Sequence, residues 1–181
     1  MGGLDPYRIS DQLDDVFLDV MVTRLETRGK HPFFQKALTE YLDAMNIDAA
    51  ESVLDMGSGT GVASRGIARR SDFAGKVTGV DLSPYLAQTA ARLADEEGLA
   101  DRVDFRTGDT RSLDLVNGTF DAVIAHTLVS HVDDPLTVLK EAARVVRPGG
   151  MVGIFDGDFA SMTFTLPDAE KTRRYDEAII N

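Results

Sequence analysis

A short stretch that combines three glycines with an acid is the first part of this chain whose residue types and spacing suggest chemistry. The stretch Asp55-Met56-Gly57-Ser58-Gly59-Thr60-Gly61 follows a short apolar run. Glycines let a backbone turn tightly and approach a ligand closely, and the free N–H groups at a helix N-terminus favour a negative group. Such a turn is weak evidence alone, because dinucleotide-binding proteins use a similar one.

Two details of this turn narrow the choice of ligand. The glycine spacing is G-x-G-x-G rather than G-x-G-x-x-G, and Asp55 stands just before the glycines. A carboxylate at that place repels a dinucleotide pyrophosphate, whereas it suits a ligand that carries cationic groups. The alternative is a structural glycine turn that binds nothing.

Two more acids stand where later strands are expected to end. Asp81 comes about twenty residues after the glycines, where a carboxylate can accept both hydroxyls of a ribose, or simply cap the following helix. In Gly108-Asp109-Thr110, Asp109 is placed to accept from an adenine amino group, and Gly108 would let the ring lie flat. A turn aspartate is the alternative for Asp109.

The elements that must position these acids follow from the hydrophobic pattern. Apolar runs predict strands at residues 52–56, 77–81, 103–106, 120–125 and 151–155, and helical segments at 60–70, 84–97 and 134–146. This alternation predicts an α/β fold with three layers, in which a mostly parallel sheet is covered on both faces. Ligands then bind beyond the carboxyl ends of the strands, where the acids stand.

The residues before the first strand follow a helical pattern. We expect helices at 10–26 and 32–45, with a break at 28–32, and a last helix from about Asp168. This predicts an N-terminal helical lid or cap over residues 1–46 and a nucleoside-binding domain over residues 47–181. Tyr7, Arg28, His31 and Phe33 are candidates for lining such a lid, although the phenylalanines could equally pack in a core.

The segment that leaves the fourth strand carries two histidines. Histidine is the side chain best suited to move a proton near neutral pH, so His126 and His131 are candidate catalytic residues. Each could instead hydrogen-bond the backbone or pack beside a ligand. Asp156 and Asp158, after the fifth strand, could hold a substrate, a cation or nothing.

Composition excludes several functions. Among 181 residues there is no cysteine, which excludes disulfides, thiolate metal sites and cysteine nucleophiles and fits a reducing, cytoplasmic location. The three histidines lack the spacing of a metal site, and no metal is expected. A net charge of −11 repels a phosphate backbone, so nucleic acid is not an expected partner. No apolar run is long enough to span a membrane.

Five motifs in order resemble the class I S-adenosylmethionine (SAM)-dependent methyltransferases, in particular the small-molecule branch of ubiquinone and menaquinone biosynthesis. They are Val53–Gly61, Gly79–Ser83, Gly108-Asp109, Phe120-Asp121 and Arg147–Gly150, and the resemblance covers residues 51–157. The resemblance implies a Rossmann-like domain that binds SAM and releases S-adenosylhomocysteine. The cofactor-binding residues that it implies are Asp55, Gly57, Ser58, Gly59, Asp81, Leu82, Gly108, Asp109, Thr110 and His126.

The resemblance also implies a role for several of these residues. Asp55, Gly57 and Gly59 would surround the methionine end and the adenosine, Asp81 would hold the ribose and Asp109 the adenine amino group. Leu82 would pack on the adenine, and His126 would line the passage between SAM and the substrate.

We therefore expect methyl transfer to an oxygen, nitrogen or carbon atom of a small molecule. The alternatives are a SAM-binding or interaction domain without turnover and an NAD-dependent oxidoreductase. Members of the resembling family usually continue past the fifth strand with a helix and an antiparallel strand pair. We expect this chain to lack that pair, which is what a C-terminal truncation would produce. The edge of the fifth strand would then be uncovered, and a homodimer is one way to cover it.

Overall fold

Five parallel strands form one sheet in the computed structural model, which describes residues 5–157 and 170. The order across the sheet is β3-β2-β1-β4-β5. The strands are β1 (Ser52–Met56), β2 (Lys76–Asp81), β3 (Val103–Thr107), β4 (Phe120–His126) and β5 (Val146–Phe155). Every described pairing is parallel, so the predicted α/β sheet is confirmed.

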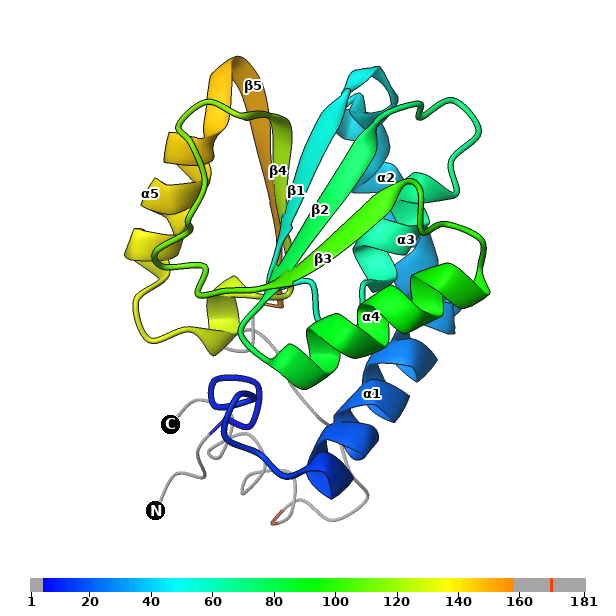
Figure 1. The fold of residues 1–181 in the computed structure, drawn as a ribbon, viewed down its shortest axis with the longest axis vertical. Coiled ribbons are helices and arrows are strands. Elements are labelled where there is room, and N and C mark those ends of the chain that lie inside the picture. The colour runs from blue at the N-terminus through cyan, green and yellow to red at the C-terminus, as the bar shows by residue number, and fades with distance from the viewer. Residues whose placement is uncertain (1–4, 158–169, 171–181) are drawn as a thin grey trace.

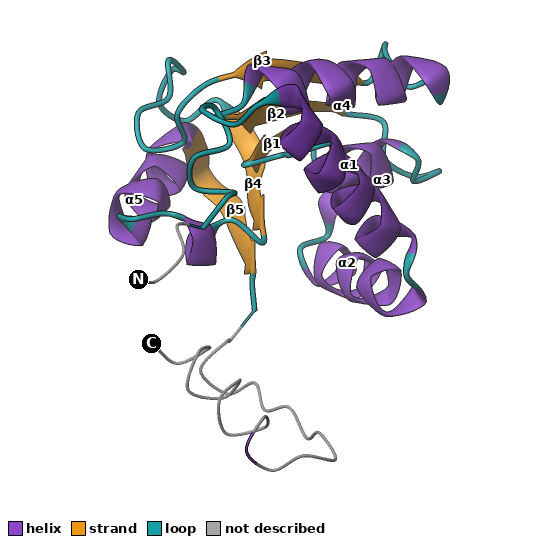
Figure 2. Ribbon diagram, turned by 90° about the horizontal axis from the view of Figure 1, so that it is seen from below, coloured by secondary structure: helices purple, strands orange, loops and turns teal. Residues whose placement is uncertain are grey.

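Helices cover both faces of this sheet and make three layers (Figures 1 and 2). They are α1 (Asp15–Lys30), α2 (Pro32–Ala44), α3 (Val62–Ala68), α4 (Pro84–Glu96) and α5 (Pro135–Val145), with short 3₁₀ turns at Ile47–Ala49 and Val129–His131. Figure 2 shows α5 on one side of the sheet and α2 and α3 on the other. Figure 1 shows α1 beside α4, below the sheet.

Alternation along the central strand explains why both faces are covered. On β1, Val53 belongs to the apolar core under α2, α3 and α4, whereas the next residue, Leu54, belongs to the core under α5. Both are fully buried. A strand that is buried on both faces is typical of parallel sheets flanked by helices. The same alternation turns Asp55 toward the face that Val53 occupies.

The first helix differs from the prediction at both ends. It begins at Asp15 rather than residue 10, because Asp14 accepts from the Phe17 amide at 2.9 Å and caps it. It continues past the expected break at residue 28 to Lys30. Gly29 is accommodated where α1 lies against α3, since a Cβ there would come 2.7 Å from Val62. The extended conformation of His31 before Pro32 ends the helix.

The last strand is longer than predicted, starting at Val146 instead of residue 151. Phe120 pairs with Val146 and Ala122 pairs with Met151, so residues 147–150 form an irregularity within β5. Gly150 is needed there, since a Cβ would come 2.6 Å from the Asp121 carbonyl oxygen. The Pro148-Gly149-Gly150 run, which we expected to separate a helix from a strand, is therefore part of the strand.

Two predictions concern residues 158–169 and 171–181, which the structure does not describe. They are the last helix near Asp168 and the missing antiparallel strand pair. A search of the described residues for a helix long and apolar enough to cross a membrane found none.

Candidate functional site

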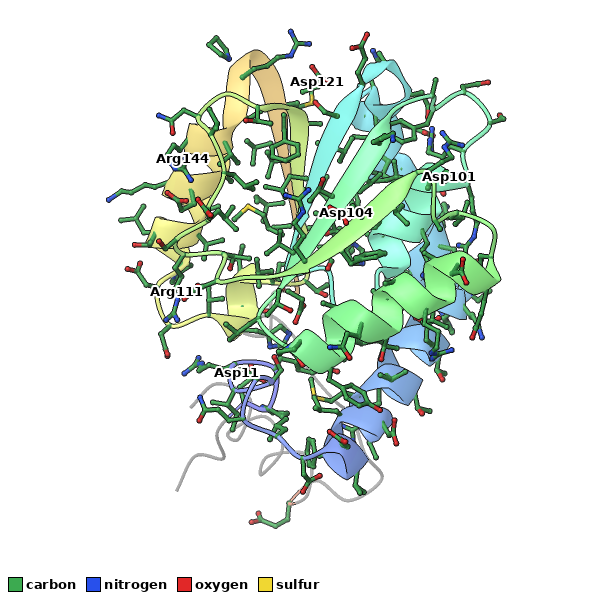
Figure 3. All side chains as sticks on the ribbon, viewed as in Figure 1. Asp11, Asp101, Asp104, Arg111, Asp121 and Arg144 are labelled. Carbon is green, nitrogen blue, oxygen red and sulfur yellow. The ribbon has the colours of Figure 1, made fainter. Side chains whose placement is uncertain are left out.

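A cavity lies beyond the carboxyl ends of β1, β2 and β4 and is also lined by residues that precede α1. Figure 1 shows this N-terminal segment, in dark blue, below the strand ends. In Figure 3, Arg111 and Asp11 lie toward this end of the sheet, and Asp121 lies at the opposite end. The predicted site residues on its wall are Asp55, Gly57, Ser58, Gly59, Asp81, Leu82, Asp109, Thr110, His126 and His131. The structure thus brings together residues from four strand ends.

Gly108 is the predicted cofactor residue that does not line this cavity. A Cβ at Gly108 would come 3.0 Å from a methyl of Val80. Its small size therefore serves packing against β2, and its predicted place under an adenine ring stays a prediction. The neighbouring Asp109 and Thr110 do reach the cavity wall.

The glycine turn is built from backbone that only glycine adopts easily. Gly57, Gly59 and Gly61 have φ angles of 69°, 54° and 77°, in the left-handed region that penalises a Cβ. The amides of Gly57 and Ser58 both donate to the Val80 carbonyl, at 2.8 and 3.0 Å. These bonds fix the turn against the end of β2 and direct it along the cavity wall.

The carboxyl group of Asp55 is buried behind this turn, with only 1% of the residue exposed. Its Oδ2 accepts from the Ser64 hydroxyl at 2.6 Å, and its Oδ1 has no hydrogen-bond partner among the described residues. Burial raises the pKa of Asp55 to about 7, although the Ser64 hydrogen bond acts in the opposite direction. An unpartnered buried acceptor on a cavity wall calls for a donor from a ligand.

Asp81 connects the glycine turn to the start of α4. Its Oδ2 accepts from the Gly59 amide at 2.7 Å, and its Oδ1 accepts from the Ser83 amide at 2.9 Å. Burial raises the pKa of Asp81 despite these bonds. The residue that caps α4 is Ser83, whose hydroxyl accepts from the Leu86 amide at 3.3 Å, and Asp81 holds the amide of this cap. Each carboxylate oxygen can accept a further hydrogen bond, so ribose binding is compatible with it.

Asp109 is more exposed than the other two acids and has a cationic partner. Arg111 donates to both of its carboxylate oxygens, at 2.8 to 3.1 Å, and the Arg111 amide donates as well. The Arg111 guanidinium holds the pKa of Asp109 below its usual value. Asp109 is thus an ionised acceptor at the cavity edge.

His126 lines the cavity where β4 ends and is held by an aromatic neighbour. Its Nδ1 lies 3.2 Å from the Tyr41 hydroxyl, and its ring stacks on that of Phe155 with centroids 5.0 Å apart. Burial, with the nearby charge of Arg28, lowers the pKa of His126 to about 4. His126 is therefore a neutral imidazole near pH 7. Sequence reasoning did not single out Tyr41, because it follows the same helical pattern as core residues.

His131 belongs to the contacts that fasten the N-terminal segment over the cavity. Its Nδ1 lies 2.6 Å from a carboxylate oxygen of Asp5, and its ring lies 4.8 Å from that of Tyr7. Arg8 adds an ion pair with Asp133 at 2.6 Å. The geometry thus gives His131 a structural partner on the segment that covers the cavity.

Arg28 is the candidate that the sequence suggested only as part of a lid. It lies on the cavity wall, donates to the Thr127 hydroxyl at 2.9 Å and sits 5.6 Å above the Phe34 ring. Thr127 has a φ of 57°, an uncommon value for a residue with a branched Cβ. The other cavity arginines, Arg8 and Arg111, have carboxylate partners. No carboxylate within the described residues pairs with Arg28.

Of the two aspartates after β5 that the sequence suggested as possible ligands, the structure describes only Asp156. Asp156 accepts from the Ser130 amide at 2.9 Å and from the Ser130 hydroxyl at 2.7 Å. It thereby anchors the turn that follows β4. Asp158 lies outside the described residues. A search of the described part of the chain for groups of three or more potential metal ligands found none.

These observations fit the ligand that the resemblance implies. SAM carries an ammonium and a sulfonium group, which suit the unpartnered Asp55 oxygen, and a carboxylate, which suits Arg28. It also carries a ribose and an adenine, for which Asp81 and Asp109 offer acceptors. Gly57 also lets the turn pack closely against Leu128 on the cavity wall, since a Cβ at Gly57 would come 2.6 Å from that side chain.

Comparisons with known proteins agree with this geometry. A family model described as methyltransferase domain matches residues 54–154. The ubiquinone/menaquinone biosynthesis C-methyltransferase of Roseobacter denitrificans is 29% identical over 162 residues, covering 90% of this chain and 59% of that protein. The ubiquinone biosynthesis O-methyltransferase of Xanthomonas axonopodis is 35% identical over 112 residues, covering 61% and 45%.

Solved structures share this fold. The crystal structure of the [4+2]-cyclase SpnF matches with a TM-score of 0.64 and 29% identity, covering 81% of this chain and 56% of that one. The chain spans between 28% and 59% of the length of the curated relatives that it matches.

Proposed function

The chain belongs to the methyltransferase domain family, and from this we propose that it transfers the methyl group of SAM to an oxygen, nitrogen or carbon atom of a small molecule. One observation supports this proposal most strongly. Asp55, Asp81 and Asp109 come from three successive strand ends and line one cavity. Because the chain spans only part of its relatives, its activity and its acceptor are proposals.

We assign each end of SAM to particular residues. The Asp55 Oδ1 atom accepts from the ammonium group, and the Arg28 guanidinium binds the carboxylate. Asp81 accepts from the ribose hydroxyls and Asp109 from the adenine amino group, with Leu82 against the ring. The support for this assignment is the unpartnered Asp55 oxygen and the lack of a carboxylate partner for Arg28 among the described residues.

Bound SAM would supply an electrophilic methyl carbon on a sulfonium. The chain then has to align the acceptor with that carbon and exclude water. We propose that residues 1–46 act as the lid that does so. The contacts of Tyr7 and Asp5 with His131, and of Arg8 with Asp133, support this role because they connect that segment to the turn after β4.

Calorimetric titration with SAM and with S-adenosylhomocysteine tests the proposal at its first step. We expect both to bind the folded protein, whereas NADH does not bind. The absence of SAM binding to protein with an intact circular dichroism spectrum would refute the function. Turnover is then measured with radiolabelled SAM and a panel of phenols, amines and activated carbon acids.

A second candidate function is binding of SAM without methyl transfer. The observation that favours it is the similarity to a protein named as a [4+2]-cyclase, which shows that a methyltransferase-like fold can carry another activity. The two functions differ in turnover and not in affinity. Release of S-adenosylhomocysteine in the presence of an acceptor separates them.

Location and assembly follow as further proposals. We propose a cytoplasmic protein, which the absence of cysteine supports. We also propose a homodimer that covers β5, where Met151, Val152 and Ile154 expose 38 to 44% of their surface. Light scattering coupled to size exclusion tests the dimer, and a monomeric mass at micromolar concentration would refute it.

A further inference from the structure

Three rings from separate elements lie nearly parallel beside the cavity: Tyr41 from α2, His126 from the end of β4 and Phe155 from the end of β5. The planes differ by 15° between Tyr41 and Phe155, by 11° between His126 and Phe155, and by 26° between Tyr41 and His126. Their centroids are 5.0 to 5.8 Å apart. This ring stack fixes the plane of the imidazole.

The position of α2 brings the tyrosine to the strand ends. Gly153 in β5 has no side chain, and a Cβ there would collide with the Met45 sulfur. Met45 follows directly after α2, one helical turn beyond Tyr41. The close approach of Met45 to β5 therefore places the Tyr41 hydroxyl beside His126, where the two side chains hydrogen-bond at 3.2 Å.

The direction of this hydrogen bond determines the tautomer of His126. Among the described residues, His126 Nδ1 is the partner that the Tyr41 hydroxyl has. A phenol is a stronger acid than a neutral imidazole, and an imidazole nitrogen is a better acceptor than a phenol oxygen. The hydroxyl therefore donates to Nδ1, and in a neutral imidazole the single proton is then on Nε2.

The charged groups around the pair agree with a neutral histidine. Burial and the Arg28 charge disfavour the imidazolium, and only Asp156 acts in the opposite direction. On the tyrosine side, burial and the Asp55 charge raise the pKa of Tyr41, so its hydroxyl keeps the proton that it donates. Asp156 is itself occupied by the two hydrogen bonds from Ser130.

We propose, on the basis of the methyl transfer suggested above, that Tyr41 is a positioning residue that fixes His126 as a neutral donor from Nε2. His126 then hydrogen-bonds an oxygen of the bound acceptor and does not remove its proton. This replaces the general-base role that the sequence suggested for His126.

The proposal narrows the class of acceptor. Asp81, Asp109 and Asp133, which also line the cavity, each have a protein partner, and Asp55 is assigned to the ammonium of SAM. With His126 as a donor and not as a base, the site suits an acceptor that brings its own lone pair to the methyl group, as an amine, a phenolate or an enolate does. The His126 N–H suits an acceptor with an oxygen at or beside the reacting atom.

Imidazole nitrogen spectroscopy tests the proposal in the intact chain without a known acceptor. Two-bond proton–nitrogen correlations of protein labelled with ¹⁵N-histidine report which ring nitrogen carries the proton. The chain has three histidines, and His126→Gln identifies the signals of His126. We expect the proton on Nε2 and no imidazolium between about pH 5 and 8, with and without S-adenosylhomocysteine.

The matched variant is Tyr41→Phe, which keeps the ring stack and removes only the hydroxyl. We expect both tautomers of His126 to become populated, while the melting curve stays close to that of the unmodified chain. A proton on Nδ1 in the unmodified chain, titration of His126 within that pH range, or an unchanged tautomer in Tyr41→Phe would each overturn the proposal. If SAM fails to bind while the tautomer is as expected, only the methyl-transfer proposal is lost.

Discussion

The two carboxylate oxygens of Asp55 differ because the Ser64 hydroxyl donates to only one of them: it lies 2.6 Å from Oδ2, whereas Oδ1 is buried and has no hydrogen-bond partner in the part of the chain that the structure describes. Ser64 is on α3, the helix that the glycine turn starts, so the turn and the acid are positioned together. This arrangement leaves one buried acceptor of a cavity-lining residue without a hydrogen bond from the described residues.

Replacement of Asp55 by asparagine removes the charge and retains the shape. A hydrogen bond to a charged group contributes about 1.5–3 kcal/mol, so we expect SAM affinity to fall about ten- to hundredfold. Calorimetry with SAM measures this loss, and Ser64→Ala is the comparison because it leaves the carboxylate in place. Equal affinity of the Asp55→Asn variant and the unmodified chain would contradict the assigned role.

The pH dependence of SAM binding follows from the pKa of Asp55, which burial raises to about 7. The ammonium of SAM binds the ionised carboxylate, so affinity should increase as the pH rises through about 7. Without SAM, the free energy of unfolding should change with pH in the opposite direction. The raised pKa of Asp55 stabilises the folded protein at low pH, and this stabilisation is lost as the pH rises from the unfolded pKa, near 4, to about 7.

Two measurements check this dependence. Calorimetry with SAM at several pH values gives the affinity, and urea titrations give the free energy of unfolding. The Asp55→Asn variant should lose most of the pH dependence in both. A variant that keeps the full dependence would show that another group, such as the buried Asp81, is responsible.

Much of the fold was predictable because hydrophobic periodicity and motif order are local in the sequence. The apolar runs located all five strands, and the glycine spacing with Asp55 located the cavity wall. The errors occurred where tertiary contacts override local patterns. Gly29 allows α1 to continue past the expected break because it lies against Val62, and Gly150 lets β5 begin early.

The part of the site that sequence could not give depends on contacts between distant residues. Tyr41 and His126 are 85 positions apart, and nothing near either residue indicates the other. Similarly, Asp5 and Arg8 contact the turn after β4 from the N-terminal segment.

Loss of Arg65 should destabilise the protein strongly. This residue on α3 is 3% exposed and forms ion pairs with Glu26 of α1, at 2.5 Å, and with Glu97 after α4. Arg65→Ala leaves the carboxylate of Glu26 without a cation and Glu97 with Arg69 alone, and removal of one partner of a buried pair costs about 3–5 kcal/mol. We expect a loss at the lower end of that range because both glutamates keep some exposure.

Arg92→Ala is the control for this experiment. Arg92 pairs with Glu96 within α4, and both side chains are more than half exposed, so water screens the pair and its loss should change stability little. Urea titration of both variants measures the difference. Similar losses for the two would mean that the Arg65 ion pairs do not hold α1 against α3.

Gly57 and Gly98 are two glycines with the same backbone conformation, and only Gly57 lines the cavity. Both have a left-handed backbone, with φ of 69° and 71°, but a Cβ at Gly57 would come 2.6 Å from Leu128, whereas a Cβ at Gly98 meets nothing within 4 Å. Gly98→Ala should therefore cost only the backbone strain of about 1–2 kcal/mol and leave SAM affinity unchanged. Gly57→Ala should cost more, since Leu128 must also move, and it should weaken SAM binding more than tenfold. Urea titration and calorimetry on both variants separate strain from crowding, and equal effects of the two substitutions would show that the contact between Gly57 and Leu128 does not shape the SAM site.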